Sequence, residues 1–431
     1  MSEFESNFPQ HWEKINLFEI CQPKQWKVIP KSELSGSGHP VYGANGIIGH
    51  YHEYSHEKPT IMIGCRGSCG GVIVSQPFSY INGNAMALDN LAEELISIDF
   101  LSKLLQGRGF KDVITGSTQP QITQENLKKV QIGLPPLNEQ TRIAQKLDEL
   151  LAQVDTLKAR IDAIPALLKR FRQSVLAAAV SGRLTEEWRV QSFGSAGEDK
   201  PAGWLPKSLP ELGELARGKS KHRPRNDERL FGGIYPFIQT GEVANSAGRI
   251  KTAKVFYSEF GLAQSRLFPK GTLCITIAAN IADTAILDLE ACFPDSVVGF
   301  VADEGKCCAQ FIKYLVDVNK QNLEAFAPAT AQKNINLKVL SELVFPMPPL
   351  AEQTEIVRRV EQFFAFADQL EAKLASAKSR IDHLTQSILA KAFRGELVPQ
   401  DPNDEPASVL LERIQAQRAA APKAKRGRKR A

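Results

Sequence analysis

The sequence predicts an α+β protein, with two strand-rich domains of mixed α/β structure separated by two long helices that form an antiparallel coiled coil. One motif occurs twice, as LPPLNEQ at 134–140 and as MPPLAEQ at 347–353. After each copy, apolar residues recur at alternating steps of four and three, the pattern of a coiled-coil seam. Between 134–184 and 347–397, 18 of 51 positions are identical without a gap, which indicates internal duplication.

The two apolar seams keep the same phase from end to end. They run from Ile143 to Val175 and from Ile356 to Ile388. Because neither seam is stable in water alone, the simplest partner for each helix is the other. The residues expected to pair the helices are Leu147, Leu150, Val154, Leu157, Ile161, Val360, Phe363, Leu370, Leu374 and Ile381.

Prolines and glycines mark the ends of both helices. The Pro–Pro pairs at 135–136 and 348–349 are tolerated in a first helical turn. Gly182 and Gly395 stand where a left-handed residue ends a helix. Each helix therefore has about 44 residues, or roughly 66 Å at 1.5 Å per residue. Pro165 removes one backbone hydrogen bond and is expected to kink the first helix.

Composition indicates a globular protein with room for two or three domains. The chain has 431 residues, of which 43% are hydrophobic. No run approaches the roughly 18 apolar residues that a membrane-spanning helix requires. The N-terminal stretch is polar and acidic, unlike a signal peptide. The seven cysteines lack disulfide-framework or zinc-ribbon spacing. We therefore expect a reduced, cytoplasmic protein.

The net charge of +5 is dominated by the last nine residues, KAKRGRKRA, which hold six basic residues and no acid. Subtracting these six charges from +5 leaves the rest of the chain near −1. Any nucleic-acid surface on the domains must therefore be a local patch rather than a field over the whole protein.

Glycine-punctuated apolar runs predict strands in both domains. In the first domain they lie within 41–51, 60–74 and 80–88, and a short helix is expected at 98–105. In the second domain the runs are 234–240, 272–278, 284–289 and 297–301, with a helix at 309–318. The expected parts are a first domain at 1–133, a first helix at 134–184, a linker at 185–200, a second domain at 201–345, a second helix at 346–397 and a C-terminal segment with a basic tail at 398–431.

Residues 213–220 match the phosphate-loop expression G-x-x-x-x-G-K-[ST]. That loop requires a buried strand before it and a helix after it. Residues 209–212 make a poor strand, and Pro224 blocks a helix. We therefore favour a basic loop that either contacts phosphates or is a solvated surface loop. Its cations are Arg217, Lys219, Lys221, Arg223, Arg225 and Arg229.

The sequence has no motif for catalysis. HExxH, GxSxG and a paired-acid nuclease signature followed by lysine are all missing. The N/D-P-P-Y/F tetrapeptide of adenine methyltransferases is also missing, since both Pro–Pro pairs precede leucine. His50, His52 and His56 near Cys65 and Cys69 lack the repeated spacing of a metal site, so a polar loop is favoured.

Several strings resemble the specificity subunit of type I restriction–modification systems. They are GSTQPQIT followed by LPPLNEQTRIA, QSVLAAAVSGRL, QSILAKAFRGELVPQDP and DEPASVLLERI. YPFIQTGEV and LFPKGTLCITIAANIADTAIL resemble strands of the second domain of that family. The resemblance covers nearly the whole chain, but the KAKRGRKRA tail is not part of the family pattern.

The resemblance implies a non-catalytic DNA sequence-recognition subunit. Each domain would be a target recognition domain that reads one half of a bipartite, asymmetric DNA site. The helices would set the spacing and dock two methyltransferase (modification) subunits, and two restriction (translocase/nuclease) subunits would join them. No cofactor or metal is expected in this chain. S-adenosylmethionine, Mg and ATP are expected in the partner subunits, and no membrane partner is expected.

Polar and basic side chains in the loops of both domains are the candidates for contact with double-stranded DNA. Tyrosine is more often a core or rim residue than a base-stacking one. An alternative function is a coiled-coil scaffold that binds proteins only, and another is an ATPase using 213–220. The candidate DNA-binding residues are Tyr42, Asn45, Arg66, Ser68, Asn84, Gln119, Lys219, Lys221, Arg223, Arg225, Gln239, Thr240, Arg249, Arg266, Asn280, Gln332 and Lys333.

Overall fold

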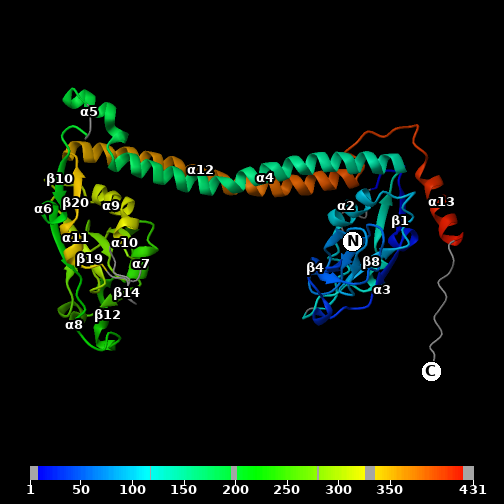
Figure 1. The fold of residues 1–431 in the computed structure, drawn as a ribbon, viewed down its shortest axis with the longest axis horizontal. Coiled ribbons are helices and arrows are strands. Elements are labelled where there is room, and N and C mark those ends of the chain that lie inside the picture. Colours follow the sequence, from blue (N-terminus) through cyan, green and yellow to red (C-terminus); the bar gives the residue numbers. More distant parts are fainter. Residues whose placement is uncertain (1–7, 117, 196–200, 279–280, 326–334, 421–431) are drawn as a thin grey trace. The chain divides into compact units, whose positions relative to one another are not determined.

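The computed structural model describes residues 8–116, 118–195, 201–278, 281–325 and 335–420. The chain forms two compact units. Unit 1 comprises residues 1–162 and 375–431, and unit 2 comprises residues 163–374. Each unit holds one strand-rich domain together with one end of both long helices (Figure 1).

The domain of unit 1 is built on a four-stranded sheet in the order β2-β8-β5-β6. A three-stranded sheet, β4-β3-β7, lies beside it, and β1 pairs with β9. The two central strands of the larger sheet, β8 and β5, are almost wholly apolar and buried, as expected for strands covered on both faces. The bounds are β1 (Glu13–Asn16), α1 (Leu17–Ile20), β2 (Gln22–Gln25), β3 (His39–Gly43), β4 (Gly46–Tyr51), β5 (Ile61–Gly64), β6 (Val72–Val74), β7 (Tyr80–Ile81), β8 (Ala85–Asp89), α2 (Ile98–Arg108), α3 (Gln124–Leu127) and β9 (Gln131–Leu134).

Helix α2 joins this sheet to the long helices. Ser97 caps its N-terminus by accepting a hydrogen bond from the backbone N–H of Phe100. The ring of Phe100 then packs edge-on against Phe393, with 6.2 Å between the ring centres. Leu147 belongs to the same buried cluster, so the core of the domain continues into the helix pair.

The domain of unit 2 has a five-stranded sheet in the order β11-β19-β16-β17-β13 and a four-stranded sheet in the order β14-β12-β18-β15. β10 pairs with β20. The bounds are β10 (Leu205–Ser208), α6 (Leu209–Leu212), β11 (Gly213–Arg217), β12 (Phe231–Phe237), α7 (Thr240–Ala244), β13 (Arg249–Ile250), β14 (Val255–Tyr257), α8 (Glu259–Ala263), β15 (Leu267–Phe268), β16 (Leu273–Thr276), β17 (Thr284–Leu287), β18 (Ala291–Cys292), β19 (Val297–Ala302), α9 (Ala309–Val318), α10 (Lys320–Ala325), α11 (Leu337–Glu342) and β20 (Val344–Met347).

The two domains share one topology. The order β2-β8-β5-β6 in unit 1 matches β11-β19-β16-β17 in unit 2. Each second sheet also contains one parallel pair, β3 with β7 and β12 with β18. The duplication inferred from the helices therefore extends to the domains. Unit 2 adds α7 and β13, and β13 extends its larger sheet by one strand.

The long helices are α4 (Leu137–Val180) and α12 (Leu350–Phe393), each of 44 residues. Gly182 and Gly395 follow them with φ of 79° and 68°, as predicted from their positions. α4 continues through Pro165 without interruption. In Figure 1 the two helices lie side by side within each unit.

Ion pairs show that the helices are antiparallel within each unit. In unit 1, Lys158 pairs with Asp382 at 3.8 Å, and Asp162 pairs with Lys378 at 2.6 Å. As the residue number rises along α4, that of its partner falls along α12. In unit 2 the ring of Phe171 lies edge-on to a phenylalanine of α12, and Arg172 pairs with Asp368 and Glu371.

Burial along the seam is concentrated near the ends of the helices, where a domain covers the pair. Leu147, Val154 and Val360 are buried, whereas Leu157 is 43% exposed and Phe363 is 40% exposed. The seam residues that are partly buried are Leu150, Ile161, Leu370, Leu374 and Ile381. Away from the domains, two helices alone cannot enclose a seam fully, which accounts for the exposed positions.

Two local predictions were wrong, and residues 209–212, which had been judged a poor strand, are a helix. Residues 185–200, expected to be a linker, contain the helix α5 (Glu186–Phe193). Residues 209–212 form the helix α6, because Ser208 and Glu211 make a capping box around Pro210 in the first turn. The strand expected at 234–240 ends at Phe237, and α7 begins at Thr240.

Candidate nucleic-acid interface

A buried glutamate near the start of each long helix fixes that helix to its domain. In unit 1, Glu139 accepts a hydrogen bond of 3.1 Å from the indole Nε1 of Trp12 and lies 2.9 Å from His11 Nε2. In unit 2, Glu352 accepts one of 2.9 Å from Trp204 Nε1. The two glutamates are 1% and 0% exposed, respectively. The glutamate of the repeated motif is therefore an anchor rather than a ligand-binding group.

The glutamine that follows each glutamate makes the same kind of hydrogen bond in both units. The side-chain oxygen of Gln140 accepts from the backbone N–H of Ser97 at 2.9 Å, and that of Gln353 accepts from Cys308 at 2.8 Å. Ser97 is the N-cap residue of α2, and Cys308 is the N-cap residue of α9, the helix that packs on the sheet in each unit. Each glutamine thus sets the position of that helix against the long helix.

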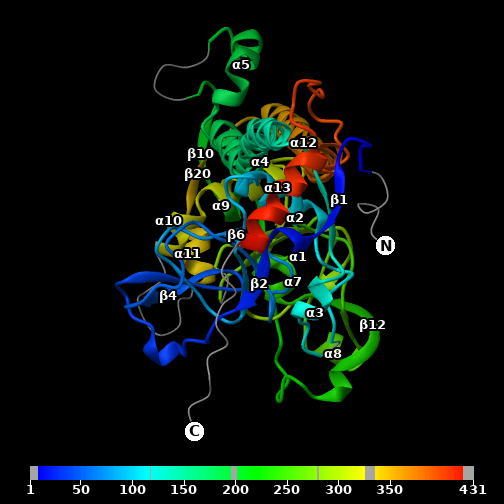
Figure 2. The same ribbon diagram turned by 90° about the vertical axis from the view of Figure 1, so that its right-hand side faces the viewer.

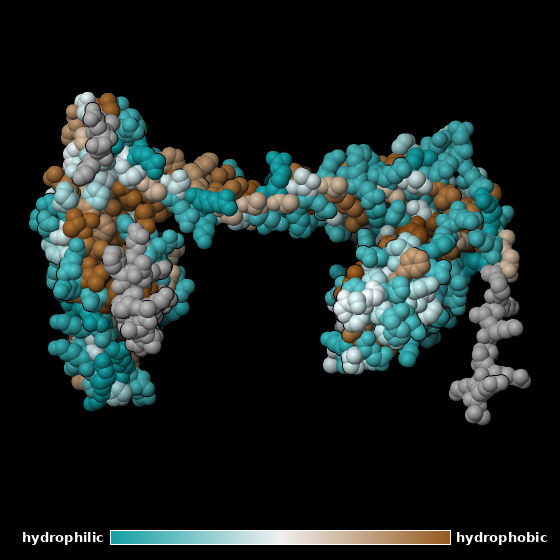
Figure 3. Space-filling view, in the orientation of Figure 1, coloured by the Kyte–Doolittle hydropathy of each residue, from teal (hydrophilic) through white to brown (hydrophobic). Residues whose placement is uncertain are grey.

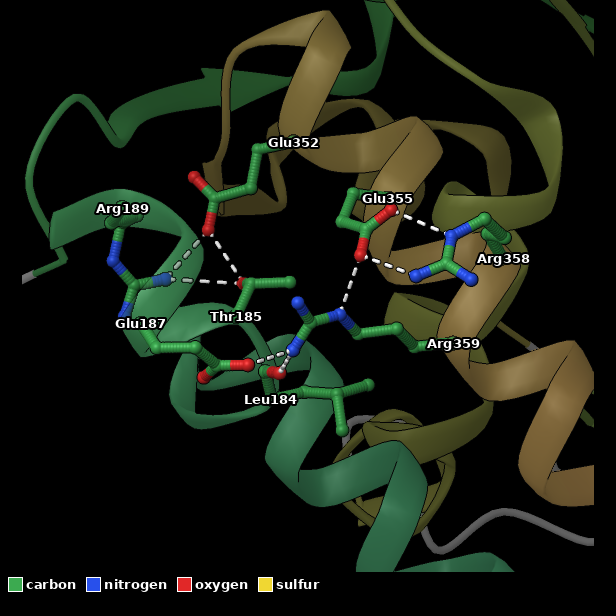
Figure 4. A network of polar contacts seen from close by, with 8 residues as sticks. All are labelled: Leu184, Thr185, Glu187, Arg189, Glu352, Glu355, Arg358 and Arg359. Carbon is green, nitrogen blue, oxygen red and sulfur yellow. Dashed lines mark hydrogen bonds and ion pairs between the residues drawn. The ribbon is translucent and has the colours of Figure 1, made fainter. Parts of the chain in front are cut away.

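The segment that follows each long helix is fixed to the start of the other long helix in the same unit. In unit 2, Arg189 of α5 forms a hydrogen bond of 2.6 Å to Glu352, and Thr185 forms one of 2.7 Å (Figure 4). In unit 1, Asp404 forms a hydrogen bond of 2.6 Å with Arg142 of α4. In both units, polar contacts therefore fix the start of one long helix to the segment that follows the other long helix.

A second ion-pair network in unit 2 surrounds the first turns of α12. Glu355 accepts hydrogen bonds of 2.7 Å and 2.6 Å from Arg358 and Arg359 (Figure 4). Arg359 also pairs with Glu187 of α5. The hydrogen bond from Arg358, with a smaller contribution from Arg359, lowers the pKa of Glu355 to about 2.

Four loops meet at one end of the sheets in unit 1. Asn45, in the β3–β4 turn, donates a hydrogen bond of 2.7 Å to Ser68 in the loop after β5. In that same loop, the backbone N–H of Arg66 donates to the carbonyl of Asn84 before β8 at 3.2 Å. The thiol of Cys69 donates to the carbonyl of Pro120 at 3.0 Å. We call this end the first loop cluster, and its candidate residues are Asn45, Arg66, Ser68, Asn84 and Gln119.

The first loop cluster presents polar atoms to solvent. Asn45, Arg66, Ser68 and Gln119 are exposed, and Asn84 is half-buried. Among the described residues Arg66 forms no ion pair, so its charge is uncompensated by the chain. Exposed amides, a hydroxyl and a guanidinium are the groups that hydrogen-bond to base edges and phosphates.

Tyr42, predicted to contact DNA, does not belong to this exposed surface. It is 5% exposed, and its hydroxyl accepts a hydrogen bond of 3.1 Å from the backbone N–H of Gln76. The alternation of β3 turns its ring inward against Met62 and Ile81. Tyr51 is partly buried, and the centre of its ring lies 5.9 Å from that of Tyr80.

In unit 2 the basic loop that follows β11 is not a nucleotide-binding loop. The chain continues from Gly218 as turns and bends to Glu228, with no helix N-terminus to receive a phosphate. Gly218 is buried, and a Cβ there would meet the carbonyl oxygens of Phe293 and Pro294 at 2.4 Å. The glycine is therefore required for close backbone packing on the β18–β19 turn.

Carboxylates neutralise part of this basic loop. Arg225 forms two hydrogen bonds of 2.9 Å and 3.0 Å to Asp295, beside the backbone carbonyl that binds Arg217. Arg229 pairs with Asp227 at 2.8 Å. Hydrogen bonds from Arg229 and His222 hold the pKa of Asp227 well below its usual value.

Four cations of the loop remain without a carboxylate partner among the described residues: Arg217, Lys219, Lys221 and Arg223, all exposed, although Arg217 donates to the backbone carbonyl of Asp295. Arg223 donates to the backbone carbonyls of Ser220 and His222 at 2.6 Å and 2.8 Å, which fixes the direction of its guanidinium. The part of the loop available to phosphates is therefore narrower than the sequence predicted.

A second basic feature of unit 2 surrounds a cavity of about 830 Å³ beside α7. Gln239, exposed at the N-cap of α7, lines it, as do Lys251 and Lys254. Thr240 follows Gln239 and is half-buried. The two lysines are exposed and were missed by the sequence reasoning, although the spacing of the string RIKTAK at 249–254 was a signal for them.

Two predicted arginines are held by carboxylates. Arg249 borders the same cavity and pairs with Asp288 at 2.8 Å. Arg266 pairs with Glu214 at 2.7 Å and lies over the ring of Phe268 at 4.7 Å. Arg266 therefore binds a carboxylate of β11 and is not a free cation. The predicted residues Asn280, Gln332 and Lys333 lie outside the described residues.

His56, one of the three clustered histidines, has two protein partners. His56 Nε2 lies 2.9 Å from Asp89, and its Nδ1 lies 2.7 Å from Ser55 Oγ. Nowhere in the described ranges do three His, Cys, Asp or Glu side chains converge as metal ligands. Among the described helices, none is both long enough and apolar enough to cross a membrane.

These features define a class of protein: a duplicated α+β recognition protein, in which two domains of one topology carry different polar loops and share an antiparallel helix pair. The family model for the type I restriction modification DNA specificity domain matches residues 9–166 and again 201–377. The chain is 30% identical over 459 aligned residues to the EcoDI specificity subunit of Escherichia coli, with 98% of each chain covered.

Other similarities agree with this result. The EcoBI specificity subunit of Escherichia coli is 35% identical, over 72% of this chain and 69% of its own. The crystal structure of the HsdS subunit from Thermoanaerobacter tengcongensis has the same fold, with a TM-score of 0.62 at 19% identity, covering 92% of this chain and all of that one. The chain belongs to the family of type I restriction–modification DNA specificity subunits.

Proposed function

We propose that the two domains, 1–133 and 201–345, each read one half of a bipartite, asymmetric DNA site. The observation that carries this proposal is the combination of one shared topology with two dissimilar sets of exposed polar side chains. The first loop cluster offers Asn45, Arg66 and Ser68, whereas the loop after β11 offers Lys219 and Lys221. Two similar scaffolds with different contact groups read two different sequences, so the complete site is asymmetric.

The long helices set the distance between the two half-sites. Each has 44 residues, which at 1.5 Å per residue is roughly 66 Å, or about 20 base pairs at 3.4 Å each. The glutamate anchors support this role, because they fix each domain to a helix through buried hydrogen bonds to Glu139 and Glu352.

The helix pair also docks two methyltransferase subunits. Large apolar side chains are exposed along it, and Figure 3 shows apolar residues at the surface of the pair. Exposed apolar residues on paired helices favour the addition of further helices from a partner. The side chains concerned are Leu157 at 43%, Leu167 at 56%, Phe363 at 40%, Phe366 at 55% and Leu384 at 45% exposure.

In this arrangement the chain itself performs no catalysis. The modification subunits bind S-adenosylmethionine and methylate adenine, and two restriction subunits add ATP- and Mg-dependent translocation and cleavage. The contacts of this chain with DNA come from the first loop cluster, from Lys219, Lys221 and Arg223, and from Gln239 and Lys251 beside α7.

Methylation mapping in cells that carry the chain and its modification subunits tests the proposal. A single bipartite motif methylated on adenine is expected. Exchanging residues 201–345 for those of another specificity subunit should change one half of the motif and leave the other half intact. Methylation without a bipartite motif would contradict the proposal, and complex formation without any DNA binding would favour the scaffold alternative.

A further inference from the structure

One isoleucine in the second sheet of each domain is held in solvent. Ile234 of β12 is 78% exposed, the highest value among the large hydrophobic side chains in the described ranges, and Ile47 of β4 is 50% exposed. Single exposed apolar residues are common on protein surfaces and need no explanation. These two, however, occupy the same strand pair of a duplicated fold, next to the polar residues proposed to contact DNA.

The strand pair that carries the isoleucine corresponds between the units. In unit 1, β3 pairs antiparallel with β4 and parallel with β7. In unit 2, β12 pairs antiparallel with β14 and parallel with β18. Each antiparallel pair is interrupted by a shift of register, between Val41 and Tyr42 in unit 1 and between Phe231 and Tyr235 in unit 2. A bulge of this kind re-aims side chains away from the regular ladder.

Glycines build the bulge of unit 2. The residues on either side of 232–234 both pair with Tyr257, so this segment leaves the ladder. Gly232 has a φ of 83°, and a Cβ at Gly233 would meet the carbonyl oxygen of Tyr257 at 2.3 Å. Two glycines within a strand cost conformational entropy on folding. The backbone here is therefore shaped to project Ile234 into solvent.

Helix α8 brings the bulge and the basic loop to the same end of the domain. Ser265, just after α8, donates a hydrogen bond of 2.8 Å to the carbonyl of Lys219. At the start of α8, Glu259 accepts a hydrogen bond of 2.8 Å from the hydroxyl of Tyr235, the residue after Ile234. Figures 1 and 2 both label β12 beside α8, at the end of the domain away from α4 and α12. An apolar side chain and a free cation therefore share this end of unit 2.

In unit 1 the isoleucine adjoins the first loop cluster. Ile47 follows Asn45 by two residues, and Asn45 donates a hydrogen bond of 2.7 Å to Ser68. A Cβ at Gly43 would meet Cγ2 of Ile48 at 2.9 Å, so Ile48 packs over the backbone of β3. Ile47 is the more exposed of the two isoleucines, and it stands beside side chains that can hydrogen-bond to base edges.

We propose that Ile234 and Ile47 contact the 5-methyl groups of thymines, each in the half-site read by its own domain. This inference rests on the proposed function, which supplies the duplex and assigns one half-site to each domain. Thymine alone among the four bases carries a methyl group in the major groove, so an apolar contact there distinguishes it. Lys219 in unit 2 and Arg66 in unit 1 provide positive charge for the phosphates nearby, and the isoleucines provide sequence information.

The test removes only the methyl group of thymine. The full chain, purified with its modification subunits, is bound to duplexes that carry the mapped site, and each thymine on either strand of both half-sites is replaced in turn by deoxyuridine. One replacement in each half-site should weaken binding about fourfold, the effect of losing one methyl group from an apolar contact. In the Ile234→Ala complex, the second half-site should bind equally well with thymine or deoxyuridine, while the effect in the first half-site persists.

Ile47→Ala is the matched control, because it should abolish the deoxyuridine effect in the first half-site only. Both variants should unfold and assemble as the unaltered chain does, since both side chains are exposed. A half-site without thymine, a flat deoxyuridine scan, or an effect that survives the alanine substitution would overturn the proposal. Loss of assembly with the modification subunits and an unchanged scan would also overturn it and assign the isoleucines to a protein contact. Failure of the unaltered complex to bind a bipartite site would instead contradict the proposed function.

Discussion

The indole Nε1 of Trp204 donates a hydrogen bond of 2.9 Å to the buried carboxylate of Glu352, and Trp12 makes the equivalent bond to Glu139. The tryptophans stand near the start of the domains, and the glutamates stand near the start of the helices. Each bond therefore ties the residue directly before the first strand of a domain to the long helix that follows its last strand. The two anchors differ in their second partner, which is Arg189 in unit 2 and His11 in unit 1.

The first prediction concerns the buried pair of Arg189 and Glu352, which are 3% and 0% exposed. Arg189→Met leaves the carboxylate without its counter-charge and should destabilise unit 2 by about 3–5 kcal/mol. Hydrogen exchange of peptides from 201–278 under native conditions measures this loss. The double variant Arg189→Met with Glu352→Gln should recover much of it, because no buried charge is left unpaired.

The exposed pair nearby supplies the matched control. Arg358 is 53% exposed where it pairs with Glu355. Arg358→Met should cost less than about 1 kcal/mol, as is typical of surface ion pairs. If Arg189→Met and Arg358→Met had the same effect, the anchor would not stabilise unit 2 through its buried charge.

The second prediction concerns acid. The hydrogen bonds from Arg358 and Arg359 lower the pKa of Glu355 from 4.5 to about 2. A depressed carboxyl pKa stabilises the folded state above the unfolded pKa, and this stability is lost as the pH falls through the folded pKa. The contribution of Glu355 should therefore disappear between about pH 4.5 and pH 2.

Chemical denaturation across that pH range measures the contribution, with Glu355→Gln as the comparison. The variant should show a smaller loss of stability below pH 4.5 than the unaltered chain. Parallel curves for the two proteins would mean that this network adds nothing to folding. Asp404, whose pKa is lowered by the hydrogen bond from Arg142, should behave in the same direction in unit 1.

The third prediction separates the free cations of the basic loop from the paired ones. Replacing Lys219, Lys221 and Arg223 with Gln should weaken binding to all DNA sequences and flatten the salt dependence by about 0.9 unit for each lost phosphate contact. Replacing Arg225 and Arg229, which already pair with Asp295 and Asp227, should change the slope less. Equal effects would show that these ion pairs open on DNA.

The features that could be predicted from the sequence are those set by local pattern. The helix expected at 309–318 is α9 with the same ends, and Gly182 and Gly395 have the left-handed φ expected of them. These depend on residues within one helical turn. The proline pairs and the periodicity of the apolar seam are likewise read directly along the chain, and they predicted both long helices.

The features that could not be predicted depend on partners distant in the sequence. Arg225 and Arg249 were read as free cations, but their carboxylates lie 70 and 39 residues away. Residues 185–200 were read as a linker because the stretch is polar and contains Gly and Ser, yet Arg189 within it pairs with Glu352, 163 residues away. Neither composition nor periodicity carries this information.

The fourth prediction tests the pairing of the helices. Leu157→Pro removes a backbone hydrogen bond inside α4 and should cost about 3 kcal/mol or more. We expect assembly with the modification subunits and DNA binding to fail together, and Leu370→Pro in α12 should act alike. Leu157→Ala is the control, because this side chain is already 43% exposed and alanine keeps the helix. Normal assembly by both proline variants, measured by co-purification, would show that the helices are not the dock.

The fifth prediction treats the helices as a ruler. A heptad inserted into each helix adds about 10 Å, or roughly three base pairs, and returns the apolar seam to the same face. The opposed positions Lys158 and Asp382, which pair at 3.8 Å, are suitable points of insertion because the added turns then face one another. The unread gap between the half-sites should lengthen by up to three base pairs, while both half-site sequences stay the same.

An insertion of four residues at the same two points is the control for this ruler. It adds about 6 Å but rotates the following seam away from its partner, so pairing and function should be lost. Methylation mapping of the seven-residue variant decides the matter, because it reports spacing and half-site sequence in one measurement. An active complex that still methylates the original spacing would show that the distance between half-sites is set by something other than α4 and α12.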